Sequence, residues 1–168
     1  MTTSEKIAAI QAKMGQTAIS QLTAYDYPTA RMLDEAGIDM ILVGDSLGMT
    51  MLGYPDTTHV TLAHMLHHGE CVARGAKNAL VILDMPIHTF DTPEQALENA
   101  RKLMETGVDA VKLEGGAAKE AEIRAIVQAG IEGGADWFIV EQDMATEGFT
   151  PMQSIEISAK YLLNEIFA

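Results

Sequence analysis

The sequence predicts an α/β protein built on a parallel sheet with flanking helices, and three observations lead to that prediction. The chain has 168 residues, 48% of them hydrophobic and 21% charged, which is typical of one globular domain. A pattern recurs along it in which a glycine closes an amphipathic stretch and an apolar run then ends in a carboxylate. These apolar runs are continuous rather than alternating, as in strands that helices cover on both faces.

Five apolar runs are predicted to be parallel strands. The first, at residues 18–23, leads to an acid at Asp26, and the other four end directly in an acid. Those four runs cover residues 40–45, 79–84, 110–114 and 137–141. A closed TIM-type barrel of eight βα units takes roughly 200 to 250 residues. We therefore expect either a partial barrel or an open sheet rearranged to a flavodoxin-like order.

Six segments are predicted to be helices, at about residues 3–14, 28–36, 61–73, 93–106, 117–129 and 151–166. Thr92 and Thr150 each precede a proline and stand three positions before a glutamine, which is the signature of a capped first turn. Gly37, Gly75 and Gly107 stand where a left-handed residue is expected to end a helix. The pattern continues without a linker, so we expect a single domain over residues 1–168.

The charge of the chain excludes several classes of partner. It has 24 acidic and 11 basic residues and a formal net charge of -13, the wrong sign for binding a nucleic-acid backbone or an anionic membrane. No run approaches the roughly 18 apolar residues of a membrane span, and the first residues lack the apolar stretch of a signal peptide. We expect a cytoplasmic protein that binds neither nucleic acid nor membranes.

Acidic residues at the predicted strand ends point to a cation site. Parallel strands bring their carboxyl ends to one rim, where ligands bind in barrels and open sheets. The acids expected on this rim are Asp26, Asp45, Asp84, Glu114 and Glu141. Crowded carboxylates repel one another unless a cation neutralises them, and oxygen ligands favour Mg²⁺ over zinc. The pattern predicts a Mg²⁺ site, while any single acid at such a position is equally explained as a cap of the next helix.

Two further polar residues are expected on the same rim. Lys112 lies inside an apolar strand two positions before Glu114, so both side chains point to the same side. This pair suggests neutralisation of a substrate's charge, or an ordinary ion pair. Ser46 lies in a turn flanked by Gly44 and Gly48, whose hydroxyl and backbone N–H groups suit a carboxylate or carbonyl oxygen.

Two histidines on one predicted helix have the spacing of metal ligands. His64 and His68 are four positions apart, but Met65 stands where a zinc protease has glutamate. We therefore expect these histidines to face solvent or a neighbouring subunit.

Several short segments resemble the ketopantoate (3-methyl-2-oxobutanoate) hydroxymethyltransferase family of pantothenate biosynthesis over about residues 1–131. They are Thr23-Ala24-Tyr25-Asp26-Tyr27, Leu42-Val43-Gly44-Asp45-Ser46-Leu47-Gly48-Met49, Asp84-Met85-Pro86, Thr92-Pro93-Glu94-Gln95-Ala96 and Val111-Lys112-Leu113-Glu114-Gly115-Gly116. The resemblance implies a parent barrel of eight units, with Mg²⁺ at Asp45 and Asp84 and in the surroundings of Glu114. It also implies that Ser46 and Lys112 contact the 2-keto acid and that methylene-tetrahydrofolate supplies the one-carbon unit.

The chemistry agrees with this resemblance, because a divalent ion that polarises a 2-keto acid acidifies the neighbouring carbon, and a carboxylate base then forms the enolate. Most of what the family carries after residue 131 is absent from the sequence. Residues 134–141 loosely resemble the family's strand that ends in the base. Glu141 is therefore a candidate base, or else a residue of a foreign strand with no substrate aligned to it.

The last stretch, residues 135–162, resembles the closing βα unit of sugar phosphate isomerase/epimerase barrels. Its join to the preceding part at Glu132-Gly133 suggests an engineered chimera or a drastic deletion, and we favour the chimera. Three functions are compatible: a barrel-fragment chimera with a vestigial Mg²⁺ and 2-keto acid site, a minimal hydroxymethyltransferase with Glu141 as base, or a sugar phosphate isomerase. Five parallel strands leave open edges, so we expect a homodimer or larger homo-oligomer.

Overall fold

The computed structural model describes residues 1–133 and, beyond them, positions 148, 150, 152, 153, 156, 157, 160 and 164. The chain divides into two compact units, Met1–Ile126 and Val127–Ala168, and the strands described below all belong to the first. Within the described part, no helix has both the length and the apolar character needed to cross a membrane.

The elements follow the predicted alternation of strands and helices. In chain order they are α1 (Thr3–Lys13), β1 (Gln21–Thr23), α2 (Tyr27–Glu35), β2 (Met40–Val43), α3 (Leu47–Thr50), the 3₁₀ turn η1 (Thr57–His59), α4 (Leu62–Gly75), β3 (Leu80–Asp84), α5 (Pro93–Met104), β4 (Ala110–Lys112), the 3₁₀ turn η2 (Gly116–Lys119) and α6 (Glu120–Glu132). The short elements α3, η1 and η2 were not expected as separate elements. The predicted strand at 137–141 lies outside the described residues.

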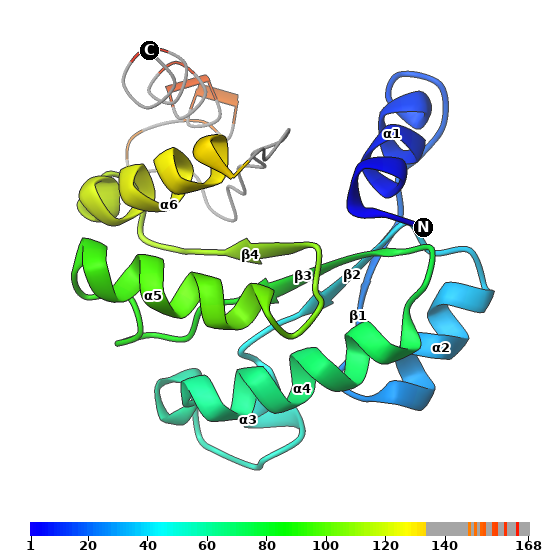
Figure 1. The fold of residues 1–168 in the computed structure, drawn as a ribbon, viewed down its shortest axis with the longest axis horizontal. Coiled ribbons are helices and arrows are strands. Elements are labelled where there is room, and N and C mark those ends of the chain that lie inside the picture. The colour runs from blue at the N-terminus through cyan, green and yellow to red at the C-terminus, as the bar shows by residue number, and fades with distance from the viewer. Residues whose placement is uncertain are drawn as a thin grey trace. The chain divides into compact units, whose positions relative to one another are not determined.

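The four described strands form one parallel sheet in the order β1-β2-β3-β4 (Figure 1). Neighbours in sequence are neighbours in space, as in a barrel, whereas a flavodoxin-like sheet would exchange the first two strands. The register pairs Ile41 with Val81 and Asp84 with Lys112. The predicted parallel α/β architecture is confirmed for this part of the chain, and the order is that of a barrel segment.

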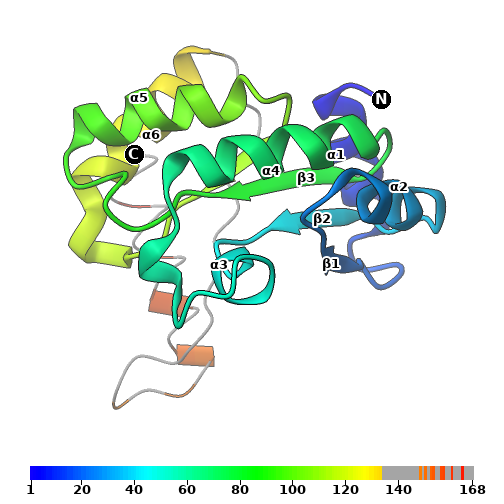
Figure 2. The ribbon, with the colours of Figure 1, turned by 90° about the horizontal axis from the view of Figure 1, so that it is seen from below.

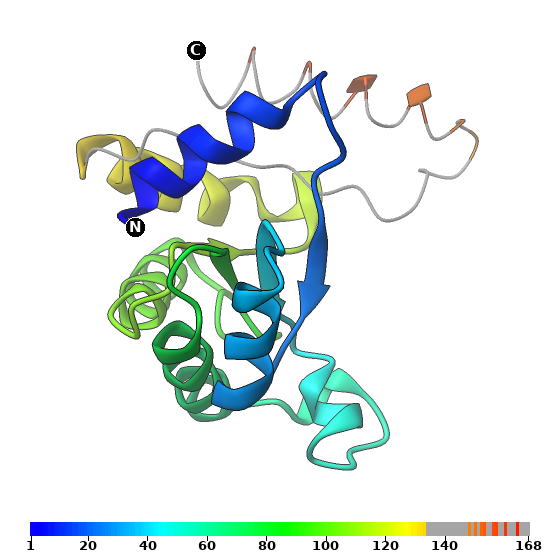
Figure 3. The ribbon, with the colours of Figure 1, turned by 90° about the vertical axis from the view of Figure 1, so that its right-hand side faces the viewer.

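The core lies between the sheet and the helices α2, α4 and α5, which lie on one side of it (Figures 2 and 3). Alternate strand residues point toward these helices. The clearest cases are Ile41, Val43, Val81 and Leu83, each at most 1% exposed. Burying such a side chain stabilises the fold by about 1.5–3 kcal/mol, which explains why the apolar runs of the sequence became strands.

Two of the three glycines predicted to end helices do so in the expected way. Gly37 and Gly107 have φ of 80° and 89°, which only glycine adopts freely. The prediction for Gly75 is wrong, because it is the last residue of α4. A Cβ there would lie 2.7 Å from the main-chain oxygen of Tyr27 and 2.8 Å from Cβ of Ala30. Gly75 is therefore explained by the close approach of α4 to α2.

Both predicted helix caps are formed. The Thr92 hydroxyl accepts the N–H of Gln95 at 3.2 Å, although the Gln95 side chain bonds Asp91 rather than Thr92. In the second unit, Thr150 and Gln153 exchange both bonds of a capping box, at 2.9 and 3.3 Å. The helix predicted at 151–166 is described only at single positions, of which 152, 153, 156, 157 and 160 are α-helical and 164 is π-helical.

Helix α1 is bonded to the amino ends of the strands. The ammonium group of Lys6 lies 2.7 Å from Asp109, one residue before β4, and Lys13 pairs with Asp39, one residue before β2. Figure 3 shows α1, in dark blue, near the end of the sheet where β1 begins. The carboxyl ends of the strands lie at the opposite end, together with the predicted rim residues Asp45, Asp84 and Lys112.

Candidate functional site

The carboxyl ends of β2, β3 and β4 bring three of the predicted site residues together. Asp84 ends β3 and Lys112 ends β4, and these two are register partners, so their side chains share one side of the sheet. The Lys112 ammonium lies 3.3 Å from Oδ1 of Asp84. Asp45, two residues past β2, donates its backbone N–H to Oδ2 of Asp84 at 3.2 Å. We call Asp45, Asp84, Lys112 and Glu114 the rim cluster.

Burial disfavours the ionised forms of the two aspartates in the rim cluster. Asp84 is 6% exposed, and burial raises its pKa to about 6, although Lys112 and the Asp45 N–H act against the rise. Burial and the charge of Glu114 also raise the pKa of Asp45, against the opposing effects of Lys112 and a hydrogen bond from Thr57. Among the described residues, Oδ1 of Asp84 has the Lys112 ammonium at 3.3 Å but accepts no well-aimed hydrogen bond. A cation bound at this pair relieves both penalties.

Glu114 belongs to the cluster through Lys112. The Lys112 ammonium lies 2.8 Å from Oε1 of Glu114, whose side chain is 68% exposed. The lysine thus bridges two carboxylates, as the same-side placement predicted. Within the described residues, no three His, Cys, Asp or Glu side chains are grouped closely enough to hold a metal.

The residues present still fit a hard divalent cation. Mg²⁺ is commonly held by only one or two protein carboxylates and completes its shell with water or substrate oxygens. Asp45 and Asp84 supply such a pair, since each carboxylate lies within the electrostatic reach of the other. The buried Oδ1 of Asp84 accepts no well-aimed hydrogen bond among the described residues and has only the Lys112 ammonium beside it, at 3.3 Å, so it is an oxygen suited to a cation. Glu114 lies in the surroundings of this pair, on the other side of Lys112.

Ser46 follows Asp45 at the rim and contacts Tyr25 in the segment after β1. Its hydroxyl oxygen lies 2.8 Å from the Tyr25 hydroxyl. A Cβ at Gly44 would lie 3.0 Å from this same oxygen, so glycine at that position leaves the Ser46 hydroxyl its room. The Tyr25 main-chain oxygen in turn accepts a hydrogen bond from Nδ1 of His68, at 2.6 Å.

Three expectations need correction or lie beyond the described residues. His68 does not simply face solvent, because it bonds Tyr25, and His64 belongs to the cap of α4, where its Nδ1 accepts the Thr61 N–H at 3.2 Å. Asp26 is a helix cap, since it accepts the Thr29 N–H at 2.8 Å. Glu141 lies outside the described residues.

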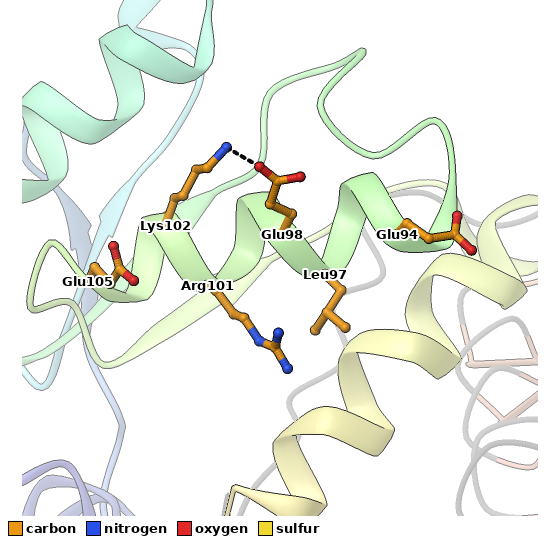
Figure 4. Close-up of a pocket in the computed structure, with 6 residues that line it drawn as sticks. All are labelled: Glu94, Leu97, Glu98, Arg101, Lys102 and Glu105. Atoms are coloured by element: carbon orange, nitrogen blue, oxygen red, sulfur yellow. Dashed lines mark hydrogen bonds and ion pairs between the residues drawn. The ribbon is translucent and has the colours of Figure 1, made fainter.

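A shallow hollow on the exposed side of α5 is a poor candidate for the site (Figure 4). It is lined by Glu94, Leu97, Glu98, Arg101, Lys102 and Glu105, all from α5 and the residue that caps its carboxyl end. Lys102 and Glu98 form an ordinary surface ion pair there, at 2.6 Å. None of these residues belongs to the rim cluster, so we take the rim as the candidate site.

A family model described as ketopantoate hydroxymethyltransferase matches residues 3–165. The chain belongs to the ketopantoate hydroxymethyltransferase family. This confirms the membership predicted from the motifs of the first 131 residues. The match also spans residues 132–133, and the join predicted there is not tested by it.

Curated relatives share about half of the aligned residues. The 3-methyl-2-oxobutanoate hydroxymethyltransferase of Pyrobaculum aerophilum is 57% identical over 111 residues, which cover 66% of this chain and 42% of the relative. That of Acetivibrio thermocellus is 52% identical over 124 residues, or 73% of this chain and 44% of the relative. The alignments thus span less than half the length of these relatives.

Solved structures support the fold. A crystal structure of 2,3-dimethylmalate lyase, a member of the PEP mutase/isocitrate lyase superfamily, matches with a TM-score of 0.70 at 20% identity, covering 95% of this chain and 60% of that one. A putative phosphonomutase from Burkholderia cenocepacia matches with a TM-score of 0.68 at 21% identity, covering 92% and 67%. At such identities the likeness shows the fold alone, and it agrees with a partial barrel.

Proposed function

We propose that the rim cluster is the divalent-cation and 2-keto acid site of a 3-methyl-2-oxobutanoate hydroxymethyltransferase. In this reaction methylene-tetrahydrofolate supplies the one-carbon unit that C3 of the 2-keto acid accepts. The proposal is supported by membership of the family and, above all, by one observation: Asp45 and Asp84 meet at the rim, with Lys112 beside them.

The charges of the cluster suit a dication and an anionic substrate. When all are ionised, the three carboxylates and the one ammonium group leave two negative charges, which one Mg²⁺ neutralises. Asp45 and Asp84 would hold the ion, with Glu114 in its surroundings. When bound, Mg²⁺ polarises the keto oxygen and acidifies the hydrogen on C3.

The chain's own residues bind and orient the substrate. Lys112, 3.3 Å from Asp84, supplies positive charge beside the place where a 2-keto acid would bring its carboxylate. The Ser46 hydroxyl donates a hydrogen bond to a substrate oxygen. Glu141 is the proposed base that takes the proton from C3, an assignment carried only by its resemblance to the family's strand.

A barrel-fragment chimera without full turnover is the second proposal. It is supported by the resemblance of residues 135–162 to another barrel, and by the partial cover of this chain, 66% and 73%, in its alignments with the two curated relatives described above. Such a protein would keep the cation and 2-keto acid site as a vestige. A sugar phosphate isomerase is a third and weaker proposal, because it rests on those last residues alone.

We also propose a cytoplasmic location. One cysteine among 168 residues suits a reducing compartment, where disulfides do not form.

Deuterium exchange at C3 of 3-methyl-2-oxobutanoate tests the proposed function. The wild type in D₂O is expected to exchange this hydrogen when Mg²⁺ is present and to stop when EDTA removes it. Asp84→Asn should lose at least about 100-fold in exchange rate, since an interaction with charged groups of about 3 kcal/mol disappears. Glu98→Gln, a surface acid of α5, is the matched control and should exchange like the wild type.

Calorimetry of 3-methyl-2-oxobutanoate with Mg²⁺ separates the proposals. Binding together with exchange that Glu141→Gln abolishes supports the hydroxymethyltransferase. Binding without any exchange supports the vestigial site of a chimera. A wild type that binds neither Mg²⁺ nor the 2-keto acid refutes both.

A further inference from the structure

The contacts of Ser46 extend away from the rim to helix α4. Ser46 Oγ lies 2.8 Å from the Tyr25 hydroxyl, and the Tyr25 main-chain oxygen lies 2.6 Å from Nδ1 of His68. His68 and Ser46 thus both bond Tyr25, one through its main chain and the other through its side chain. We call Ser46, Tyr25 and His68 the serine relay.

The donors and acceptors of the serine relay fix the proton of His68 and allow two directions for the bond between Tyr25 and Ser46. A carbonyl oxygen only accepts, so Nδ1 of His68 must carry the hydrogen. A serine hydroxyl has one proton and can donate it to one partner only. If Tyr25 donates to Ser46, the serine keeps its own proton for a ligand. The oxygens of a 2-keto acid are all acceptors, so this is the direction that favours binding.

Tyr25 lies just beyond the sheet, where its position is set by packing against the core and by the bond from His68. Ala24 donates the last bond from this segment to the neighbouring strand, to the Leu42 oxygen at 3.2 Å. Tyr25 then precedes Asp26, which caps α2. The His68 bond therefore connects the β1–α2 turn to α4 at the residue whose hydroxyl reaches Ser46.

Helix α4 packs closely against both β3 and α2 in the stretch that follows His68. A Cβ at Gly69 would lie 2.7 Å from Cδ2 of Leu83 in β3, and one at Gly75 would lie 2.7 Å from the main-chain oxygen of Tyr27 in α2. These close approaches leave α4 little freedom to slide. His68 accordingly holds the Tyr25 oxygen from a rigid support.

We propose that Tyr25 and His68 are positioning residues that direct the Ser46 hydroxyl proton toward the 2-keto acid. The proposal rests on the proposed function, because it takes the 2-keto acid as the ligand of Ser46. Tyr25 donates to Ser46 Oγ, and His68 fixes Tyr25 where it can do so. Neither residue needs to touch the substrate.

Four variants test the relay. Tyr25→Phe removes the hydroxyl and keeps the ring, and His68→Leu removes the ring N–H. His68→Asn is the conservative variant, since its amide N–H can occupy the place of Nδ1–H. His67→Leu is the matched control one position earlier, at an exposed ring that approaches His68 edge to face, with centroids 5.3 Å apart.

The measurements are calorimetric affinities for 3-methyl-2-oxobutanoate with Mg²⁺ and for Mg²⁺ alone. Loss of one oriented hydrogen bond should weaken 2-keto acid binding about five- to tenfold in Tyr25→Phe and His68→Leu. His68→Asn should recover to within about threefold, and His67→Leu should stay within about twofold. The affinity for Mg²⁺ alone should be unchanged in all four, because Asp45 and Asp84 hold the ion.

A double-mutant cycle separates positioning from packing. In a Ser46→Ala background, Tyr25→Phe should cost less than about twofold, because the proton it directs is gone. Equal losses of Mg²⁺ and 2-keto acid affinity would show a packing role and overturn the proposal. So would a full effect of Tyr25→Phe in the Ser46→Ala background, or wild-type affinity in both Tyr25→Phe and His68→Leu.

The ring tautomer of His68 separates failure of the relay from failure of the proposed function. Nitrogen-15 NMR of the wild type without ligand should show the proton on Nδ1. A proton on Nε2 instead would overturn the His68 contact whatever the protein binds. A wild type that binds no 2-keto acid would refute both the proposed function and the proposed role of Ser46 in binding it. The tautomer of the His68 ring would still decide whether His68 donates to Tyr25.

Discussion

Asp84 has two conflicting roles in the fold. Its side chain ends the most buried strand, and burial raises its pKa to about 6. A carboxyl group whose pKa is higher in the folded state contributes stability that is fully present below the unfolded value, near 4, and lost as the pH rises through about 6. At neutral pH the ionised group therefore destabilises the metal-free fold and favours a bound cation.

Asp84→Asn should consequently stabilise the metal-free protein at pH 8. The gain is expected to be about 1–3 kcal/mol, since two pKa units correspond to about 3 kcal/mol at most. Urea unfolding in EDTA at pH 8 and pH 5 measures it, and the difference between the variant and wild type should shrink at pH 5. Added Mg²⁺ should stabilise the wild type and leave the variant unchanged. A variant less stable than wild type at pH 8 would contradict the assigned cost of this charge.

Aspartates at different strand ends have different roles: one caps a helix and another lies in the rim cluster. The sequence distinguishes these roles only in part. Asp26 is followed by Tyr27-Pro28, the start of α2, and a proline at that position is a readable sign of a helix cap. Asp84 is followed by a longer turn before α5, so its carboxylate stays at the rim. The bond from His68 to Tyr25 spans 43 positions, and helical spacing alone indicates only a face of α4, so this contact was not predictable.

At the scale of elements, Asp34 holds α2 to the start of β3. Its carboxylate accepts the backbone N–H groups of Asn78 and Ala79, both at 2.7 Å. Burial alone would raise the pKa of Asp34, but the N–H donors outweigh burial and lower it. The stability that Asp34 contributes is thus present above its unfolded pKa, near 4, and lost as the pH falls through the lower folded value.

Asp34→Ala should destabilise the protein by about 2–4 kcal/mol, because two backbone N–H groups lose their buried acceptor. Glu35→Ala is the matched control, an exposed neighbour in a surface pair with Arg31, and should cost less than about 1 kcal/mol. Urea unfolding at pH 7 compares the two. Equal losses in both variants would show that the Asp34 bonds carry no special weight.

The strands and long helices were predictable because their signals are local: continuous apolar runs, capping threonines and closing glycines. Gly75 shows the limit of such signals. A glycine at a helix end gives the same sequence signal whether it adopts positive φ or allows another backbone to approach closely. At Gly75, only the packing of α4 on α2 distinguishes these two explanations. The order of the strands likewise follows from packing, because each βα unit has the same local pattern.

At the scale of the whole molecule, the outer strands of the described sheet bear on assembly. Among the described residues, β1 and β4 each pair with one neighbour only. Leu22 of β1 is 48% exposed, although its register partner Ile41 is fully buried. Exposed edges of this kind favour pairing with another chain, so we keep the proposal of a homodimer or larger homo-oligomer.

Light scattering after size exclusion should accordingly give a mass of at least about twice the 18.1 kDa of the chain. Leu22→Lys should shift the protein toward monomer, since a charge at an edge opposes pairing. Met14→Lys, at an exposed position after α1, is the matched control and should leave the mass unchanged. A wild type that elutes as a stable monomer would refute the assembly.

The ion pairs of α1 stabilise the sheet at the amino ends of its strands, whereas the candidate site lies at their carboxyl ends. Lys6 and Lys13 bind acids that precede β4 and β2, at the end away from the rim cluster. If the proposed function holds, a redesign of the 2-keto acid preference would therefore vary the turns after the strands and leave the opposite end unchanged. Libraries built that way should retain foldable members even when their ligand preference changes.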